Sequence, residues 1–163
     1  MRRTASVPAR INIIGEHTDR FGGMALSFPS QHRLVLSASR SRSGAIGDPV
    51  VVRLWESAGG WDAELKVQSE IPIGAGMSSS AALCVAVAMC SGNFDGEMDV
   101  SLEAQRIEHE VLDSHCGLLD QIAITHSTKG YATLIDFDCM SVSDFRVPSD
   151  WLFKLVDTGI RRN

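Results

Sequence analysis

The chain lacks any long hydrophobic run. Its longest apolar stretch, residues 81–90, is ten residues, well short of the roughly 18 or more that a membrane-spanning helix needs. Arg2 and Arg3 imitate the start of a signal peptide, but no apolar segment follows them. We therefore expect neither a membrane anchor nor a membrane partner.

Positive charge and paired cysteines are also scarce. The 15 lysines and arginines are outnumbered by 20 aspartates and glutamates, which gives a net charge of −5. This balance argues against nucleic acid as the partner, because a phosphate backbone attracts basic surfaces. None of the four cysteines forms a CxxC pair. We expect reduced thiols in a cytoplasmic protein.

The composition that remains is that of a globular chain. Hydrophobic residues make up 44% and charged residues 21%, unlike a disordered segment. A length of 163 residues fits one domain or a piece of a larger protein. No internal repeat or low-complexity segment is present.

The pattern of apolar residues changes halfway along the chain. The first half favours strands at residues 10–14 and 24–41, then a hairpin of residues 50–55 and 63–68 around the glycine pair at 59–60. The second half favours a buried helix that ends at Gly92, a helix from an N-cap at Ser101, and a helix over residues 118–126. Strands are expected again at residues 131–137 and 152–160. The predicted class is α+β.

The first candidate site lies where the opening strand ends. Residues 9–23 read ARINIIGEHTDRFGG, so an isoleucine-rich strand is followed at once by Gly15 and a run of polar side chains. This run places two acids, an imidazole and a hydroxyl side by side in a loop. Arg10, just ahead of the loop, is a candidate cation for an anionic group.

The second candidate is the glycine-rich stretch IPIGAGMSSSAAL, residues 71–83. Gly74 and Gly76 allow the main chain to approach a ligand closely, and the helix that follows offers free N–H groups to an anion such as phosphate. The serine hydroxyls suit Mg²⁺, which prefers hard oxygen ligands. The Walker A pattern is absent. The alternative interpretation is an ordinary glycine turn with a serine cap.

The third candidate is HCGLLDQ, residues 115–121. Asp120 alone is better explained by a helix cap or a salt bridge, and Glu108 lies on the preceding predicted helix. Together with an anion-binding loop, two such carboxylates meet the needs of Mg²⁺-dependent phosphoryl transfer, in which one holds the metal and the other accepts a proton.

These three motifs, in this order, resemble the GHMP small-molecule kinases, and GEHTD within the first motif resembles their galactokinase branch. Residues 130–137 and 157–163 are similar to segments that follow in that branch. The resemblance implies the GHMP-kinase N-terminal domain, a ribosomal protein S5 domain 2-like fold with helices packed on a mixed sheet. It implies that residues 1–163 are this domain, truncated, with the C-terminal GHMP domain absent.

The implied activity is ATP-dependent phosphorylation of galactose at its anomeric hydroxyl. The family's sugar contacts fall on Glu16, His17, Thr18, Asp19 and the backbone of Gly117. A dense set of polar side chains is what a sugar requires, because its several hydroxyls must all be satisfied.

The remaining roles concern ATP and the transferred phosphate. The resemblance assigns Asp120 as catalytic base, Arg10 as the cation that stabilises the transition state, and Ser80 and Glu108 as ligands of Mg²⁺. The phosphates of ATP would be wrapped by the glycine loop and helix start, namely Gly74, Ala75, Gly76, Met77, Ser78, Ser79 and Ser80.

Several positions depart from the family. Ala9 stands in place of glycine and Arg20 in place of tyrosine, where a positive charge could favour an acidic sugar. The segment from residue 19 to 72 is short, and the third glycine-rich motif is absent. We expect exposed apolar surface where the missing domain would pack, and self-association through it.

Three alternatives stay open. The chain could be a non-catalytic sugar- and ATP-binding remnant or sensor, or a kinase for a related sugar such as arabinose or galacturonate. His109, His115 and Cys116 could also form a zinc site, although we interpret the two histidines as structural or surface residues.

Overall fold

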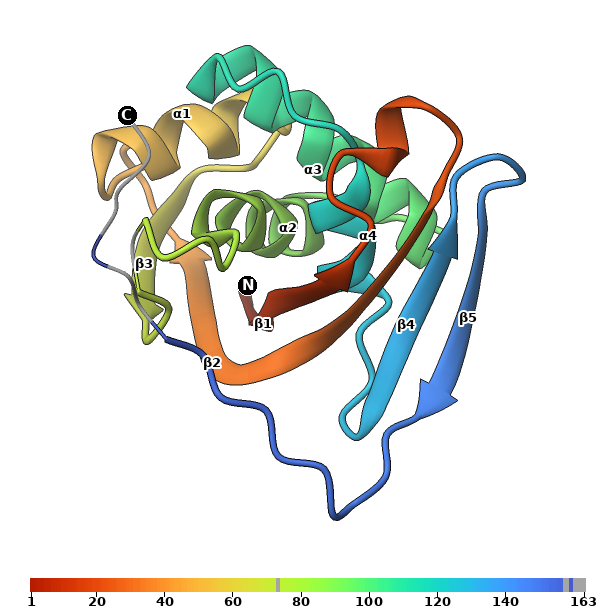
Figure 1. Ribbon diagram of the computed structural model, residues 1–163. Coiled ribbons are helices and arrows are strands. Elements are labelled where there is room, and N and C mark those ends of the chain that lie inside the picture. The colour runs from red at the N-terminus through yellow and green to blue at the C-terminus, as the bar shows by residue number, and fades with distance from the viewer. Residues whose placement is uncertain (73, 157–158, 160–163) are drawn as a thin grey trace.

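The structure, a computed structural model, describes residues 1–72, 74–156 and 159. A five-stranded antiparallel sheet carries the helices on one face (Figure 1). Its strands are β1 (Arg2–Ile14), β2 (Met24–Arg40), β3 (Ala63–Ser69), β4 (Tyr131–Asp136) and β5 (Ser141–Arg146). The helices are α1 (Pro49–Ser57), α2 (Ser79–Ser91), α3 (Glu97–Leu112) and α4 (Leu119–Thr125), with a short 3₁₀ helix, η1 (Thr18–Arg20). The predicted α+β class is confirmed.

The long strand β2 organises the sheet. One edge pairs with β1, while the other edge is divided between β3, which pairs with residues 34–40, and β4, which pairs with residues 24–27. Register shifts interrupt β1 after Pro8 and after Asn12. Such bulges bend a strand and redirect its side chains, and these two lie on either side of Arg10, just before the polar loop.

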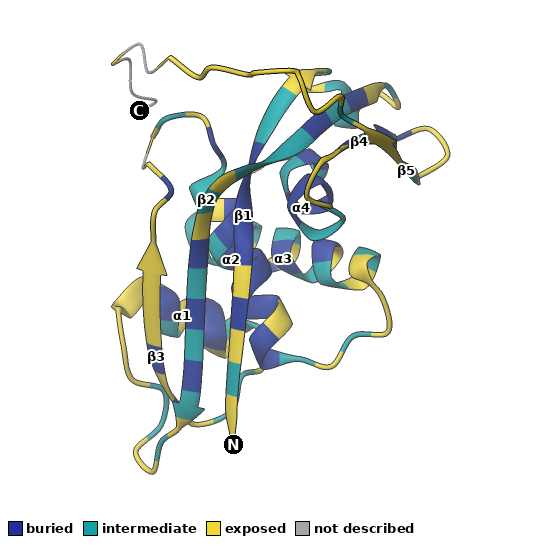
Figure 2. Ribbon diagram, turned by 90° about the horizontal axis from the view of Figure 1, so that it is seen from below, coloured by how far each residue is buried: buried dark blue, intermediate teal, exposed yellow. Residues whose placement is uncertain are grey.

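The core lies between the sheet and α2. Figure 2 looks at the uncovered face of the sheet, with the helices behind it. Most of α2 is buried, and Val85, Ala86 and Val87 are fully so, as its all-round apolar sequence predicted. A second cluster packs α4 against β2 and β4. Within the described part of the chain, no helix is long and apolar enough to cross a membrane.

The predicted hairpin is wrong, because residues 50–55 belong to helix α1. Asp48 caps that helix: its carboxylate accepts hydrogen bonds from the N–H groups of Val50 (2.9 Å) and Val51 (3.4 Å), with Pro49 in the first turn. Aspartate followed by proline is a strong helix-start signal, and it outweighs the strand preference of the valines. β3 pairs with β2 instead.

Two further predictions fail. Ser101 lies inside α3, whose N-cap is Gly96, and the Ser101 hydroxyl donates to the Glu97 carbonyl at 2.9 Å. Residues 152–156 form no strand; of the rest of that predicted strand, only Gly159 is among the described residues. Phe153 instead packs its ring on Phe28 of β2, with 4.5 Å between centroids.

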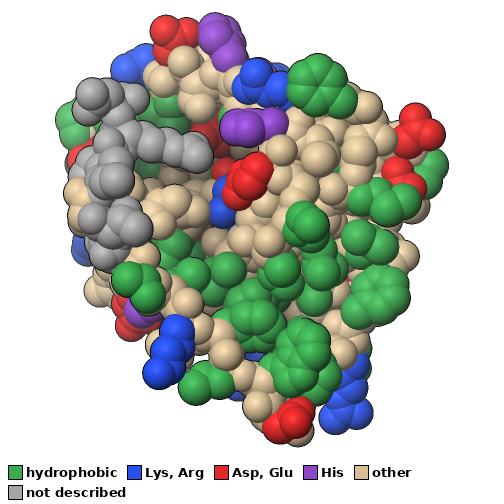
Figure 3. All heavy atoms as spheres, in the orientation of Figure 1, with side chains coloured by type: hydrophobic (Ala, Val, Ile, Leu, Met, Phe, Trp, Pro, Cys, Tyr) green, Lys and Arg blue, Asp and Glu red, His purple; other side chains and the backbone are tan. Residues whose placement is uncertain are grey.

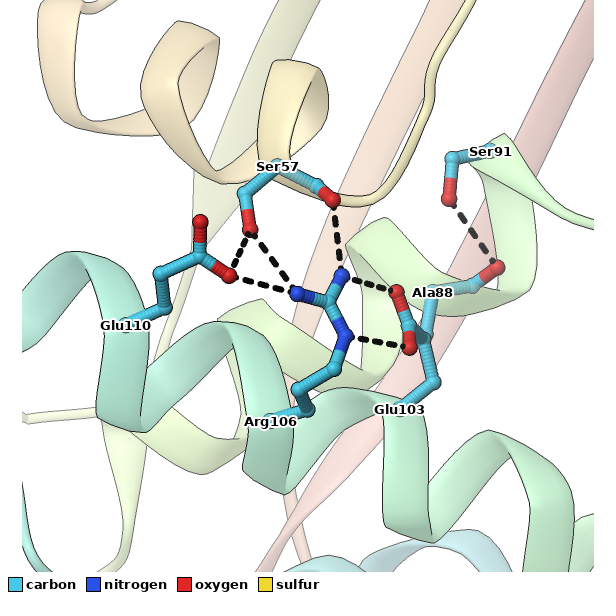
Figure 4. A network of polar contacts seen from close by, with 6 residues as sticks. All are labelled: Ser57, Ala88, Ser91, Glu103, Arg106 and Glu110. Carbon is cyan, nitrogen blue, oxygen red and sulfur yellow. Dashed lines mark hydrogen bonds and ion pairs between the residues drawn. The ribbon is translucent and has the colours of Figure 1, made fainter.

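An arginine on each of α1 and α3 stabilises the end of the other helix. Arg106 of α3 donates to the Ser57 carbonyl at the end of α1 (2.7 Å) and pairs with Glu103 and Glu110 on its own helix (Figure 4). Arg53 of α1 donates in return to a carbonyl of the last turn of α3 at 3.1 Å. Cationic donors at helix C-termini satisfy free carbonyls and the helix dipole.

We expect Arg106→Ala to lower the free energy of unfolding by about 1 kcal/mol, since the side chain is partly exposed and its ion pairs are screened by solvent. Urea denaturation of this variant beside Arg42→Ala, which changes an exposed arginine outside the network, measures the difference. Equal midpoints for the two variants would show that the contacts between α1 and α3 contribute nothing to stability.

Candidate active site

A pocket of about 250 Å³ lies beside the loop that joins β1 to β2. One wall is the polar loop with η1, the other is the segment between α3 and α4, and Arg10 of β1 and Asp120 of α4 also line it. In Figure 3, acidic, basic and histidine side chains gather on the upper half of the face shown, above a broad apolar area. The described lining residues are Arg10, Glu16, His17, Asp19, Arg20, Ser114, His115, Cys116, Gly117, Leu119 and Asp120.

Arg10 and Asp120 form an ion pair between β1 and α4. The guanidinium donates twice to one carboxylate oxygen, from Nε at 2.7 Å and from Nη2 at 2.6 Å. Its Nη1 donates to the Gly76 carbonyl at 2.9 Å. Arg10 is therefore fixed between the carboxylate and the glycine loop. Asp120 does form the salt bridge that was the alternative interpretation, and this salt bridge is compatible with a catalytic role for the same carboxylate.

The glycine loop reaches the same carboxylate through Ser78. Gly74 and Gly76 both have φ of 72°, which glycine adopts freely, and a side chain at Gly76 would meet open space. Ser78, at the N-cap position of α2, has φ of 56° and makes no capping hydrogen bond; its hydroxyl donates to Asp120 Oδ2 at 2.5 Å. The serine-cap alternative is therefore wrong.

The other residues of the glycine loop divide between surface and core. Ser79 and Ser80 begin α2, with Ser80 exposed, whereas the side chain of Met77 is buried in the core. Ala75 packs against that core. Met77 and Ala75 can therefore offer a phosphate only their backbone groups, and the hydroxyls come from the three serines.

Asp19 connects the two walls of the pocket. Its Oδ2 accepts a hydrogen bond from the backbone N–H of Leu119 at 3.2 Å, and so caps α4 from outside the helix. Gly117 lies against the same carboxylate, and a Cβ added there would be 1.7 Å from Oδ2. The sequence placed both residues at the sugar, but their contact with each other was not predicted.

The other residues of the polar loop differ in what they can offer a ligand. Glu16 and His17 are exposed, line the pocket, and make no side-chain hydrogen bond or ion pair with any other described residue. Thr18 is not among the described lining residues, because its hydroxyl donates to the carbonyls of Gly15 (2.7 Å) and Met24 (3.0 Å). Thr18 thus shapes the loop, while Glu16 and His17 keep their polar atoms available.

The side chains of Ser80 and Glu108 interact with each other, and neither is among the described residues that line the pocket. Glu108 is 3% exposed and accepts a hydrogen bond from the Gln121 amide at 2.7 Å. Burial raises the pKa of its carboxyl, while hydrogen bonds from Ser80 and Gln121 act in the opposite direction. A hydroxyl in contact with a carboxylate is a hard-oxygen pair, so the two residues fit the donor chemistry of Mg²⁺.

The segment from 113 to 118 is held from α3 as well. His109 Nε2 lies 2.8 Å from the Cys116 carbonyl, and the Gln105 amide lies 3.4 Å from the same oxygen. Among the described residues, no three histidine, cysteine or acidic side chains come together as a metal site. The zinc alternative has no support there, and His109 has a structural contact, as interpreted from the sequence.

Sequence reasoning missed several residues of this site. Ser114 and Cys116 line the pocket, and the Gln121 amide positions Glu108. No local signal distinguishes Ser114. Gln121 ends the HCGLLDQ motif one residue after Asp120, and its contact with Glu108 joins α4 to the preceding helix α3, so spacing within one helix gave no signal for it.

The comparisons with known proteins agree with this architecture. Residues 34–128 match the family of GHMP kinases N terminal domains, and residues 2–40 match the galactokinase galactose-binding signature. A galactokinase of Chloroflexus aurantiacus is 31% identical over 196 aligned positions, which cover 98% of this chain and 50% of that protein. One of Thermotoga maritima is 32% identical, covering 94% and 52%. The chain spans about half the length of the curated relatives it matches.

Solved structures show the same fold. The Lactococcus lactis galactokinase complexed with galactose superposes with a TM-score of 0.76 at 20% identity, over 90% of this chain and 47% of that one. The mevalonate kinase of Methanococcus jannaschii gives a TM-score of 0.66 at 13% identity, over 92% and 57%. This chain therefore belongs to the GHMP kinases: it has the fold of their N-terminal domain, and in sequence it is similar to galactokinases.

Proposed function

We propose that the chain carries the catalytic half of an enzyme that transfers a phosphoryl group from ATP to the anomeric hydroxyl of galactose. The single observation that supports this most is the position of Asp120. Its carboxylate contacts Ser78 at the start of α2 and also lines the pocket formed by the sugar loop. A phosphate held by the glycine loop and a sugar held by the polar loop would meet at this carboxylate.

Asp120 has the capacity to act as the base. A carboxylate offers about four acceptor sites, of which Arg10 occupies two and Ser78 one. The remaining site can accept a proton from a sugar hydroxyl. Arg10, fixed between Asp120 and Gly76, would place positive charge where the phosphoryl group develops negative charge.

The sugar is the ligand that the polar loop fits. Glu16 and His17 present unpartnered polar atoms to the pocket, and Asp19 and the Gly117 backbone form its inner wall. The galactose-binding signature found in residues 2–40 supports galactose over other hydroxyl-rich ligands. We also propose a cytoplasmic location for the protein. Its four cysteines are free, and thiols stay reduced in the cytoplasm.

Ser80 and Glu108 would hold Mg²⁺. When bound, the ion would supply charge neutralisation on the phosphates of ATP. The burial of Glu108 matters here, since burial disfavours the ionised carboxylate in the free protein despite its hydrogen bonds, whereas a bound cation would favour the ionised form.

We expect Glu108→Gln to separate stability from metal binding. The uncharged amide should raise the free energy of unfolding by about 1 kcal/mol because it removes a buried charge, and it should abolish the Mg²⁺-dependent part of stabilisation by ATP. Thermal unfolding with ATP, with and without Mg²⁺, measures both, and Glu56→Gln on the exposed face of α1 is the matched control. Undiminished Mg²⁺ dependence in Glu108→Gln would remove this residue from the metal site.

The proposed reaction is tested by ADP release with galactose, arabinose and galacturonate in parallel. We expect turnover with galactose above the other two sugars. A preference for either alternative would make this a kinase of that sugar. Sugar-dependent thermal stabilisation without ADP release would instead support a binding protein.

We also propose that the uncovered face of the sheet mediates self-association. Cross-strand partners share a face, and the pairs Ile14–Leu26 and Leu26–Leu134 place β1, β2 and β4 side chains there. Met24 and Phe145 follow on the same face and are more than half exposed. Contiguous apolar surface of this kind favours association.

For this face we expect a concentration-dependent dimer by light scattering after size exclusion. The double substitution Met24→Ser and Phe145→Ser should raise the dimer dissociation constant about tenfold or more, because two central apolar contacts are lost. Leu102→Ser, at a comparably exposed leucine on α3, should leave it unchanged. A wild-type chain that stays monomeric at high concentration would contradict the proposal.

A further inference from the structure

Arg20 joins the two walls of the pocket at its outer rim. It is the last residue of η1, its side chain is exposed, and its Nη2 donates to the carbonyl of His115 on the opposite wall. Both residues line the pocket. The contact joins two segments that are 95 residues apart in the sequence.

The wall that Arg20 reaches has little structure of its own. Residues 113–118 contain no helix or strand, yet they carry Gly117 and lead directly into Asp120. Asp19 holds the inner end through Leu119, and His109 holds the middle from behind through the Cys116 carbonyl. At the outer end the His115 side chain is 87% exposed, and its ring lies 6.2 Å from that of His109 on α3. Arg20 contacts the backbone of this residue from the opposite wall of the pocket.

We propose that Arg20 is a positioning residue that clamps residues 113–118 against the sugar loop. With the clamp closed, the Gly117 backbone and the Asp120 carboxylate keep their places before the sugar arrives, so less ordering is required on binding. The consequence for galactose rests on the proposed function. The clamp itself is a property of the free chain.

The contact also bears on the other role considered for Arg20, recognition of an acidic sugar. The guanidinium is directed to a backbone carbonyl on the facing wall. A clamp of this kind affects the binding of any sugar that contacts Gly117. A positive charge that recognises a carboxylate affects only the binding of galacturonate. The two roles therefore predict different results for the two sugars.

Hydrogen exchange of the ligand-free chain tests the clamp directly. In Arg20→Ala we expect amides of residues 113–118 to exchange at least about threefold faster, with α2 and α3 unchanged and the melting temperature preserved, because the contact is at the surface. Arg20→Lys, which keeps a positively charged donor group but not the planar guanidinium, should restore part of the protection. Arg146→Ala, at an exposed arginine on β5, is the control. Wild-type exchange in Arg20→Ala would overturn the proposal.

Calorimetric titration then tests the link to the sugar. We expect Arg20→Ala to weaken galactose binding about fivefold, in proportion to its loosened loop, and Arg20→Lys to recover part of the loss. A loss confined to galacturonate would overturn the clamp in favour of charge recognition. Absence of galactose binding by the wild-type chain would contradict the proposed function, and the exchange result would still decide the clamp.

Discussion

Asp120→Asn should reduce phosphoryl transfer to galactose by a factor of about 10² to 10⁴, the range that a positioned base contributes. The amide has nearly the shape of the carboxylate. Its oxygen can still accept from Arg10, and its NH₂ group can donate to the Ser78 hydroxyl, so the local packing should persist. It cannot take a proton from a sugar hydroxyl.

The substitution also leaves the largely buried Arg10 without its counter-ion. We expect a loss of about 1–3 kcal/mol in the free energy of unfolding, less than for a fully buried pair because the Asp120 side chain is 29% exposed. Galactose binding should stay within about threefold of wild type. ADP release, calorimetry and urea denaturation separate these effects, with Asp113→Asn, at an exposed aspartate of the same segment, as control. Turnover at the wild-type rate would show that another group is the base.

Gly117→Ala should remove galactose binding almost entirely. The new methyl group would be 1.7 Å from Asp19 Oδ2, a distance that no pair of non-bonded atoms tolerates, so either the loop or the carboxylate must move. Either movement breaks the bond from Asp19 to the Leu119 amide. We expect a loss of about 1–3 kcal/mol in stability and a rise of more than about tenfold in the dissociation constant of galactose.

The matched control for Gly117→Ala is Gly96→Ala, where an added Cβ meets nothing within 4 Å and φ is not positive. It should change stability by less than about 1 kcal/mol and sugar binding not at all. The comparison is made by calorimetry and thermal unfolding of both variants. If Gly117→Ala binds galactose as the wild type does, residue 117 does not form a wall of the sugar site.

The residues that meet at the candidate site could be named from the sequence because each motif is local, whereas their chemical roles stay predictions. The glycines, serines and acids of residues 71–83 and 115–121 have meaning as short stretches, and so does the polar loop after β1. What the sequence could not supply were the contacts between motifs, such as Asp19 with Leu119, 100 positions apart. Those depend on the sheet that brings the segments together.

The errors in the fold have identifiable causes. Three consecutive valines at 50–52 favour a strand, but the capping carboxylate of Asp48 and Pro49 in the first turn favour a helix, and the segment forms α1. Ser101 is typical of an N-cap, yet the N-cap of α3 is Gly96, five residues earlier. The strand β5 and the first half of β1 escaped notice because their apolar residues are few, although each pairs with a strand that the sequence did predict, β4 and β2 respectively.

If the proposed function holds, the position of Asp19 limits how the sugar specificity of this site can be changed. Because Asp19 Oδ2 accepts the hydrogen bond from the first amide of the helix that carries the proposed base, Asp120, we expect replacement of Asp19 to disturb the position of Asp120 along with sugar specificity. Mutant libraries aimed at sugar specificity should instead vary Glu16 and His17, whose side chains make no hydrogen bond or ion pair with other described residues, and should keep Asp19.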